Sequence, residues 1–303
     1  MIIPPTLRQG DCIGIFAPSG PIRDQAKVES GIRVLHGMGF RTKQLPCQDA
    51  DCDYLAADDQ TRADMFHALL ADDDVSALMA LRGGYGCLRI MGVIDFDLIE
   101  SYPKFIIGFS DLSILLNAIN SRAGILTIHG PVLTSLDHTD NESCQSLFSL
   151  LTEGLPQYFP ADDIAVLHTG IAEGVLRGGN LATLVHLLGT PWEIPWNGTV
   201  LLLEDTAETM YRIDRMLTQL YLSGKLQQLA GIILGSFDTG DNSDSNRLLE
   251  EKVWQRTLEL TEKMDYPVWA NFPVGHLEKN NALPLGADVI MDSSSTRLLI
   301  KTM

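Results

Sequence analysis

Short apolar runs alternate with amphipathic stretches through the first half of the chain. The apolar runs at 12–16, 41–45 and 77–81 have the length and composition of β-strands. The stretches at 25–38 and 61–70 carry apolar residues at helical spacing. Strands and helices that alternate in this way predict a parallel sheet covered by helices.

A further apolar run at 105–107 leads into a predicted helix. The apolar positions of this helix recur at i, i+3, i+4 and i+7, in Leu112, Leu115, Leu116 and Ile119. Gly124 follows at the point where a left-handed residue commonly ends a helix. The strand and the helix therefore continue the α/β pattern of the first half.

The pattern weakens between 137 and 168, where polar residues and the prolines Pro156 and Pro160 indicate a connection. We therefore predict a first domain at 1–140, a linker at 141–168 and a second domain at 169–303. A chain of 303 residues with 45% hydrophobic residues can form two cores of ordinary size.

The second half of the chain mixes strands and helices. The expected elements are a helix after Gly179, a strand at 200–203, a helix at 206–222, a strand at 231–237 and a hairpin of 288–291 with 297–301. This mixture favours a smaller, β-rich and barrel-like second domain.

The net charge limits the partners that the protein can have. There are 22 basic and 39 acidic residues, which give a formal charge of −17. This charge repels phosphate backbones and anionic lipid headgroups, so we expect neither nucleic acid nor a membrane surface as a partner. The segment 1–20 lacks the basic start of a signal peptide, and no apolar run approaches the roughly 20 residues that span a bilayer. We expect a cytoplasmic protein.

The cysteines give no sign of a metal site or a disulfide framework. They are odd in number and widely spread, at Cys12, Cys47, Cys52, Cys87 and Cys144. The sequence contains neither a His-Glu-x-x-His helix nor a phosphate-binding P-loop motif. We therefore expect reduced thiols, with no metal and no cofactor.

Ser110 is the most specific candidate for chemistry. It follows a buried strand and Gly108, and it precedes the amphipathic helix, so it is expected at the carboxyl edge of the sheet. The start of that helix offers free N–H groups for a developing oxyanion. The arrangement resembles a nucleophile elbow, except that Leu112 stands where the usual Gly-x-Ser-x-Gly motif has its second glycine. The alternative is that Ser110 only caps the helix.

Two glycine-rich turns, at 82–86 and 177–180, precede predicted helices. Both can bring backbone amides close to a ligand, although a plain tight turn is an equally good interpretation. The first is a poor dinucleotide motif because Arg89 stands where a third glycine or alanine belongs. If Ser110 is a nucleophile, this first turn follows a neighbouring strand and can supply a second oxyanion donor.

A serine nucleophile needs a base and an acid that orients the base. His129 and His276 each stand beside a glycine at the end of an apolar run, and their positions in the sequence do not decide between them. Glu204 and Asp205 end a strand of three leucines, where a carboxylate needs a partner. The alternative makes Asp205 a helix cap and pairs Glu208 with Arg212, which still leaves Glu204 without a structural role.

Taken together, the segments resemble the LD-carboxypeptidase family, which comprises muramoyl-tetrapeptide carboxypeptidases and their microcin-immunity relatives. The resemblance spans nearly the whole chain. It rests on Ala17-Pro-Ser-Gly20, Tyr54-Leu-Ala with Arg62, Arg82-Gly-Gly-Tyr-Gly86, Gly108-Phe-Ser-Asp111, His129-Gly-Pro131, Gly178-Gly-Asn-Leu181, Leu203-Glu-Asp205 with Tyr211-Arg-Ile-Asp-Arg215, and Gly275-His276 with Leu283-Pro-Leu-Gly286.

The resemblance implies a catalytic triad of Ser110, His276 and Glu204, and it thereby selects His276 as the base. It also implies an oxyanion hole made by the backbone amides of Asp111 and Gly84. The implied fold is a doubly wound, flavodoxin- or Rossmann-like domain followed by a mixed, β-rich domain. The active site is expected between the two domains, and a homodimer is expected as well.

The implied activity is the hydrolysis of the L,D amide bond that releases terminal D-Ala from murein tetrapeptides during cell-wall recycling, through an acyl-enzyme. Arg82 is a candidate for binding the terminal carboxylate, because a guanidinium matches a carboxylate with two hydrogen bonds. The alternative for Arg82 is a structural ion pair with a nearby carboxylate. Tyr85 is a further candidate for substrate contact.

Other functions are open at this stage. A microcin-immunity-type peptidase would cleave peptide–nucleotide conjugates, and Trp192 and Trp196 are the aromatic residues that we consider for stacking on a base. A non-catalytic protein that binds a ligand in a cleft is another possibility. The missing third glycine argues against a nucleotide-binding Rossmann enzyme.

Overall fold

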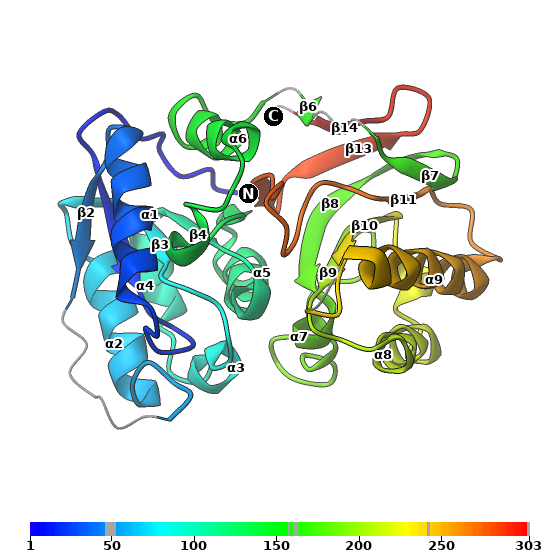
Figure 1. Ribbon diagram of the computed structural model, residues 1–303, viewed down its shortest axis with the longest axis horizontal. Helices are drawn as coiled ribbons and strands as arrows, with labels where there is room; N and C mark the ends of the chain where they lie inside the picture. Colours follow the sequence, from blue (N-terminus) through cyan, green and yellow to red (C-terminus); the bar gives the residue numbers. More distant parts are fainter. Residues whose placement is uncertain (46–52, 157, 160–162, 241–242, 302–303) are drawn as a thin grey trace. The chain divides into compact units, whose positions relative to one another are not determined.

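A computed structural model describes residues 1–45, 53–156, 158–159, 163–240 and 243–301 (Figure 1). The chain divides into two compact units. Unit 1 contains Met1–Gly154 and Asn281–Pro284, and unit 2 contains Leu155–Asn280 and Leu285–Met303. The predicted domain limits at 140 and 168 stay a prediction. Cys12, Cys87 and Cys144 are free thiols, whereas Cys47, Cys52 and Pro160 lie outside the described residues.

Unit 1 is built on a sheet with the strand order β12-β5-β4-β3-β1-β2. Its strands are β1 (Cys12–Phe16), β2 (Arg41–Gln44), β3 (Val75–Ala80), β4 (Phe105–Gly108), β5 (Thr127–His129) and β12 (Leu283–Leu285). From β2 to β5, all neighbouring strands pair in parallel, as the sequence pattern predicts. The strand order reverses between β1 and β3, and ligands of such sheets bind outside the carboxyl ends of the strands at this point.

Helices cover both faces of this sheet, so the prediction of a doubly wound fold is confirmed (Figure 1). One group packs together around α2 and α5: α2 (Asp59–Leu70), α3 (Cys87–Ile90), α4 (Phe96–Ser101) and α5 (Ser113–Ala123). The other elements are α1 (Gln25–Gly37), η2 (Leu133–Ser135) and α6 (Asn141–Thr152). The helix α6 was not predicted; it buries Leu147, Leu150 and Leu151 on one face.

Unit 2 is built on a mixed sheet with the order β6-β14-β13-β8-β9-β10-β11-β7. Its strands are β6 (Tyr158–Phe159), β7 (Ala165–His168), β8 (Ile171–Asn180), β9 (Thr199–Asp205), β10 (Gly231–Phe237), β11 (Val268–Ala270), β13 (Asp288–Asp292) and β14 (Arg297–Ile300). The strands β8 to β11 are parallel, and the sheet curls into a half-barrel. The predicted hairpin is confirmed by the antiparallel pairing of β13 with β14.

The helices of unit 2 are α7 (Leu181–Val185), α8 (Met210–Leu222) and α9 (Ser243–Thr261), with a short turn η3 (Leu226–Gln228). The helix α7 packs against β8 and β9, α9 packs against β10, and α8 packs against α7 and α9. The helix α8 begins at Met210, and Thr209 occupies its N-cap position. The expectation that Asp205 caps this helix is therefore wrong, and its carboxylate has other partners.

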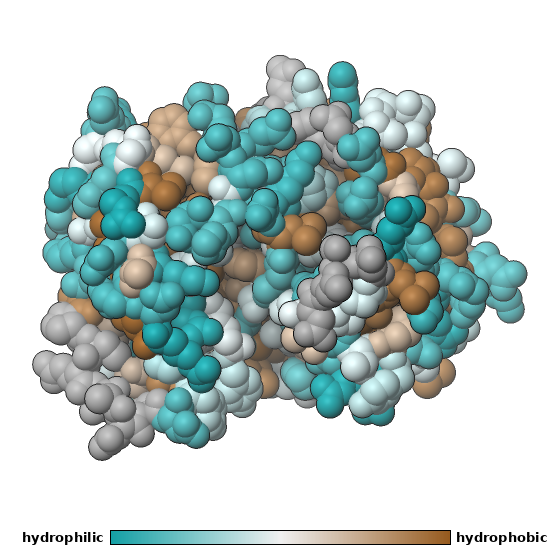
Figure 2. Space-filling view, viewed as in Figure 1, coloured by the Kyte–Doolittle hydropathy of each residue, from teal (hydrophilic) through white to brown (hydrophobic). Residues whose placement is uncertain are grey.

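The apolar residues of both units lie mainly in the sheets and on the inner faces of the helices. The strands β9 and β10, for example, are buried along their whole length. The face shown in Figure 2 carries mostly hydrophilic side chains, with hydrophobic ones in scattered patches. Within the described ranges, we find no helix with the length and apolar character of a membrane span.

Candidate functional site

Ser110 occupies a strained turn at the carboxyl end of β4. Its φ angle is 63°, in the left-handed region that a serine rarely adopts. Phe109 is the residue that precedes the 3₁₀ turn η1 (Ser110–Leu112), and α5 follows directly. The alternative that Ser110 caps the helix is therefore wrong. Strain of this kind accumulates at functional sites, and it is the conformation of a nucleophile elbow.

Gly108 explains why this elbow has leucine at position 112. A side chain at position 108 would approach Leu112 Cγ to 2.8 Å and Ala80 Cβ to 3.3 Å. The absence of a side chain at Gly108 thus lets the buried Leu112 fold back over the end of β4. In the usual motif the second glycine permits the close approach of helix and strand. Here Gly108, the first glycine, permits it alone.

The glycine turn after β3 borders Ser110. A Cβ atom on Gly83 would lie 3.0 Å from Ser110 Cβ and 3.1 Å from its Oγ. Gly84 has a φ angle of 127° and contacts Gly20, whose amide donates to the Gly83 carbonyl at 3.4 Å. Only glycines fit this packing of two loops, so the backbone of the turn lies directly beside the candidate nucleophile.

Arg62 holds these loops in place. Its side chain is buried and donates hydrogen bonds to the carbonyls of Pro18, Ala57 and Gly86, and it pairs with Asp59. A guanidinium has five donors in a fixed fork, which suits it to bridge several carbonyls. The sequence shows Arg62 only as one residue of a family motif. Its role in holding these loops together through hydrogen bonds was not predicted.

Asp111 is a second link between the same loops. Its Oδ2 accepts from Ser19 Oγ at 2.6 Å and from the Cys87 amide at 2.8 Å. Burial raises the pKa of the Asp111 carboxyl, although both hydrogen bonds oppose this shift. The residue after Ser110 is thus fixed by its side chain, and its backbone amide is held at the start of the helix.

The candidate acid and base form a hydrogen-bonded pair in unit 2. His276 Nδ1 lies 2.7 Å from Glu204 Oε2. The Glu204 side chain is fully buried, whereas the imidazole is 21% exposed. Glu204 lies at the carboxyl end of β9, level with Asn180 of β8. A buried carboxylate that holds one imidazole nitrogen leaves the ring ready to exchange protons through the other.

Two glycines let the His276 loop approach β9 and β10. A Cβ on Gly275 would overlap with Ser236 Oγ and lie 3.2 Å from Glu204 Cβ, and its φ angle of 125° favours glycine. A Cβ on Gly235 would lie 2.5 Å from the Val274 carbonyl. The buried Asn280 accepts a hydrogen bond from the Gly275 amide at 3.0 Å. These contacts fix the position of His276.

Charge in this part of unit 2 favours a protonated imidazole. Burial lowers the pKa of His276, but the charge and hydrogen bond of Glu204, followed by the charges of Asp238 and Asp205, outweigh this and raise it above 6.5. Burial, followed by the charge of Glu204, raises the pKa of Asp205 to about 7. The Asp205 carboxylate accepts from the Asn180 side chain and from the amides of Ala182 and Thr206.

His129, the other candidate base, has a different environment. It lies in β5 beside Gly108, is completely buried and packs edge-on against Phe109, with 6.1 Å between ring centres. A base must exchange protons with the substrate and with water, and a fully enclosed imidazole is poorly placed for this.

Ser110 and His129 belong to unit 1, whereas Glu204 and His276 belong to unit 2.

The remaining candidates are the expected substrate contacts, Arg82 and Tyr85, and two features of unit 2, the second glycine turn and Trp196. Arg82 is half-buried and donates to the Pro21 carbonyl at 2.9 Å, and within the described part of the chain it forms no ion pair with a carboxylate. Tyr85 is exposed and packs against Tyr54. The second glycine turn lies inside β8, where a Cβ on Gly178 would overlap with the Leu202 backbone, so these glycines serve the packing of the sheet. Trp196 is buried in the core.

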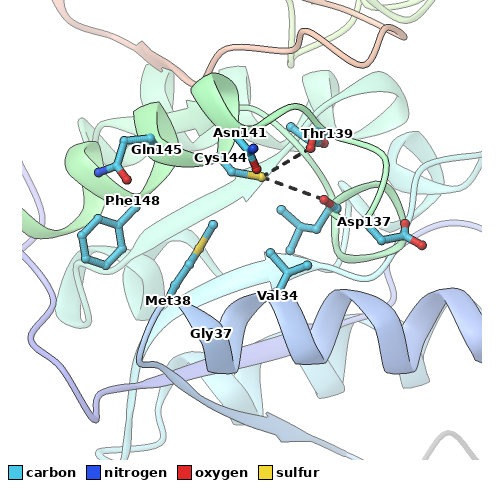
Figure 3. Close-up of a pocket in the computed structure, with 10 residues that line it drawn as sticks. Val34, Gly37, Met38, Asp137, Thr139, Asn141, Cys144, Gln145 and Phe148 are labelled. Carbon is cyan, nitrogen blue, oxygen red and sulfur yellow. Dashed lines mark hydrogen bonds between the residues drawn. The ribbon is translucent and has the colours of Figure 1, made fainter.

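A cavity of about 570 Å³ in unit 1 contains none of the candidate residues (Figure 3). It lies between α1, which contributes Val34 and Gly37, and α6, which contributes Cys144 and Phe148. The Cys144 thiol points to the carbonyls of Leu136 and Thr139 (Figure 3). Burial, followed by the charge of Asp140, raises the pKa of this thiol, which disfavours its reactive thiolate form.

Known proteins resemble this chain over nearly its whole length. The LD-carboxypeptidase N-terminal domain matches residues 13–130, and the LD-carboxypeptidase C-terminal domain matches residues 173–291. A probable murein peptide carboxypeptidase of Bacillus subtilis is 34% identical over 98% of this chain and 94% of its own length. A murein tetrapeptide carboxypeptidase of Pseudomonas aeruginosa is 31% identical over 94% of each chain.

The fold also has a close counterpart among solved structures. The microcin C7 self-immunity protein MccF, in its wild-type apo state, superimposes with a TM-score of 0.89 at 24% identity. The superposition covers 100% of this chain and 99% of the other. Both units therefore have counterparts in a single known architecture.

Proposed function

We propose that this chain, which belongs to the LD-carboxypeptidase family of serine-type hydrolases, is a murein peptide carboxypeptidase. The reaction is hydrolysis of the L,D amide bond that releases the terminal D-Ala of murein tetrapeptides. The observation that carries this proposal is the left-handed Ser110 beside the glycine turn, because a serine in that conformation is costly without a catalytic use.

In the first half of the reaction, His276 takes the proton of the Ser110 hydroxyl as Ser110 Oγ attacks the scissile carbonyl carbon. Glu204 holds the imidazole through Nδ1 and stabilises the imidazolium that forms. The carbonyl π electrons move to the oxygen and give a tetrahedral oxyanion. When this collapses, the C–N bond breaks and the imidazolium gives its proton to the amine of D-Ala, which leaves an acyl-enzyme.

The oxyanion is held by the backbone amides of Asp111 and Gly84. The support for this role is that Asp111 follows Ser110 at the helix start and that Gly83, which precedes Gly84, borders the Ser110 side chain. Each such donor typically contributes about 2.7–4 kcal/mol of transition-state stabilisation.

In the second half of the reaction, His276 takes a proton from water as the water attacks the acyl carbon. The new tetrahedral intermediate collapses, the C–O bond to Ser110 breaks, and the serine regains its proton from the imidazolium. The products are the shortened peptide, with a new carboxylate, and free D-Ala.

Substrate contacts come from Arg82, for the terminal carboxylate, and from the exposed ring of Tyr85. We further infer a cytoplasmic enzyme of cell-wall recycling that acts as a homodimer. The support for this setting is the net charge of −17 and the names of the murein-specific relatives.

The experiment uses the tetrapeptide L-Ala-γ-D-Glu-meso-diaminopimelyl-D-Ala and its diastereomer ending in L-Ala. Release of D-Ala, with at least a tenfold preference over L-Ala, would support the proposal. Hydrolysis of a peptide–nucleotide conjugate in place of the tetrapeptide would assign the chain to microcin-immunity chemistry. Tight binding of peptide without turnover would identify a non-catalytic binder.

A further inference from the structure

A cavity of about 260 Å³ in unit 1 is rich in positive charge. It is lined by Ile22, Arg23, Asp24, Lys27, Arg82 and Thr134. Three of these side chains are cationic and one is anionic, in a chain whose net charge is −17. A local excess of positive charge in an acidic protein is opposite to its average surface, which points to an anionic ligand.

The cavity lies where a doubly wound sheet usually binds its ligand. The segment 22–27 follows β1, Arg82 follows β3, and Thr134 follows β5, so every lining residue comes after the carboxyl end of a strand. The order of the sheet reverses between β1 and β3. Ligands of such folds bind outside the carboxyl ends at this reversal.

The cationic groups are available to a ligand. Arg82 donates one bond to the Pro21 carbonyl, and within the described ranges Arg23, Lys27 and Arg82 form no ion pair with a carboxylate. The single acid, Asp24, caps α1 by accepting from the Ala26 amide at 3.0 Å. Burial, followed by the charge of Arg23, lowers the pKa of Arg82, a repulsion that a bound anion would relieve.

Arg82 adjoins, along the chain, the glycine turn that borders the candidate nucleophile. Arg82 directly precedes Gly83, which packs against the Ser110 side chain. The carboxylate of a single leaving residue lies about one residue length, roughly 3.8 Å, beyond the scissile bond. A substrate whose carbonyl lies at Ser110 thus needs its carboxylate bound about one residue from the glycine turn, and Arg82 is the cation that adjoins this turn in the chain.

We propose that Arg23, Lys27 and Arg82 form a subsite that holds the C-terminal carboxylate of the peptide substrate. This inference rests on the proposed function and deepens it, because it explains why the enzyme removes one terminal residue. Arg82 makes the direct, charge-assisted hydrogen bonds, and the Thr134 hydroxyl offers one more donor. Arg23 and Lys27 are exposed and add positive potential that attracts the anion to the cavity.

The test compares tetrapeptides with a free and with an amidated C-terminus. In the wild type, kcat/KM for the free peptide should exceed that for the amide. Arg82→Ala should reduce kcat/KM for the free peptide about 10- to 100-fold, and the double variant Arg23→Ala/Lys27→Ala about 5- to 10-fold, with little change for the amide. Arg33→Ala is the control, since Arg33 is exposed on the same helix and does not line the cavity.

Binding separates this inference from the proposed function. Calorimetry with the Ser110→Ala protein should give tighter binding of the free peptide than of the amide, and adding either set of cavity substitutions should bring the two Kd values together. Variants that keep the full preference for the free carboxylate would overturn the subsite, even if the wild type releases D-Ala. If the wild type releases none, the proposed function fails, and the same Kd ratio still decides on the subsite.

Discussion

His276 Nδ1 lies 2.7 Å from Oε2 of Glu204, a carboxylate whose side chain has no exposed surface. Within unit 2, this hydrogen bond joins a strand end to a loop that is 72 residues further along the chain. A buried carboxylate that holds a partly exposed imidazole favours one tautomer and one ring orientation. Two consequences follow, one for the pH profile and one for the packing of the loop.

The pH profile should depend on Glu204. Its charge raises the pKa of His276 against the lowering effect of burial, and the base works only when it is deprotonated. The kcat/KM of the wild type should therefore rise with pH through a midpoint above 6.5. Glu204→Gln removes the raising charge, so the midpoint should move to lower pH. The maximal rate should fall by about 10²- to 10⁴-fold, because the tautomer is no longer held.

Glu251→Gln is the control for this profile, because Glu251 is an exposed acid on α9. It removes one negative charge and should leave the midpoint unchanged. A Glu204→Gln enzyme with the wild-type midpoint would show that another group sets the pKa of the base.

Gly275→Ala should displace the His276 loop. The added Cβ would overlap with the buried Ser236 Oγ at a φ angle of 125° that alanine does not favour. We expect a loss of stability of about 1–3 kcal/mol and a fall in kcat of about 100-fold, measured by urea denaturation and by D-Ala release. Gly92→Ala is the control, since a Cβ there meets nothing within 4 Å. Equal behaviour of the two variants would contradict the role given to Gly275.

Arg62→Met should destabilise unit 1. The substitution leaves the carbonyls of Pro18, Ala57 and Gly86 without their donor in a buried setting, and we expect a loss of about 2–5 kcal/mol. The midpoint of urea denaturation measures this. Arg33→Met, at an exposed position, should change the midpoint little. An Arg62→Met protein as stable as this control would mean that the loops are held by other contacts.

The sequence predicts the α/β layers because each strand and helix carries its own periodic pattern. The β13–β14 hairpin and the parallel order of β1 to β5 are examples that the structure confirms. The strand β12 was missed because it depends on a distant partner: it returns to the first sheet beside β5. The helix α6 was missed although its signals are local, because Asp140 caps it and Leu147, Leu150 and Leu151 lie on one face within otherwise polar sequence.

The candidate site was predictable only in part for the same reason. The strand-turn-helix pattern points to Ser110, but nothing local distinguishes His276 from His129 or tells that Asp205 binds Asn180 and Ala182 instead of capping α8. The bracing by Arg62 also depends on carbonyls from three separate loops. The catalytic roles of Ser110, Glu204 and His276, and the domain limits at 140 and 168, stay predictions.

The most direct measurement of the central claim is D-Ala release from the murein tetrapeptide by the wild type, Ser110→Ala and the exposed control Ser121→Ala. We predict release by the wild type and by Ser121→Ala, and a loss of at least about 10⁴-fold in Ser110→Ala. A mass shift on Ser110 equal to the acyl tripeptide in a quenched wild-type reaction would identify the intermediate. Release by Ser110→Ala at the wild-type rate would contradict the account.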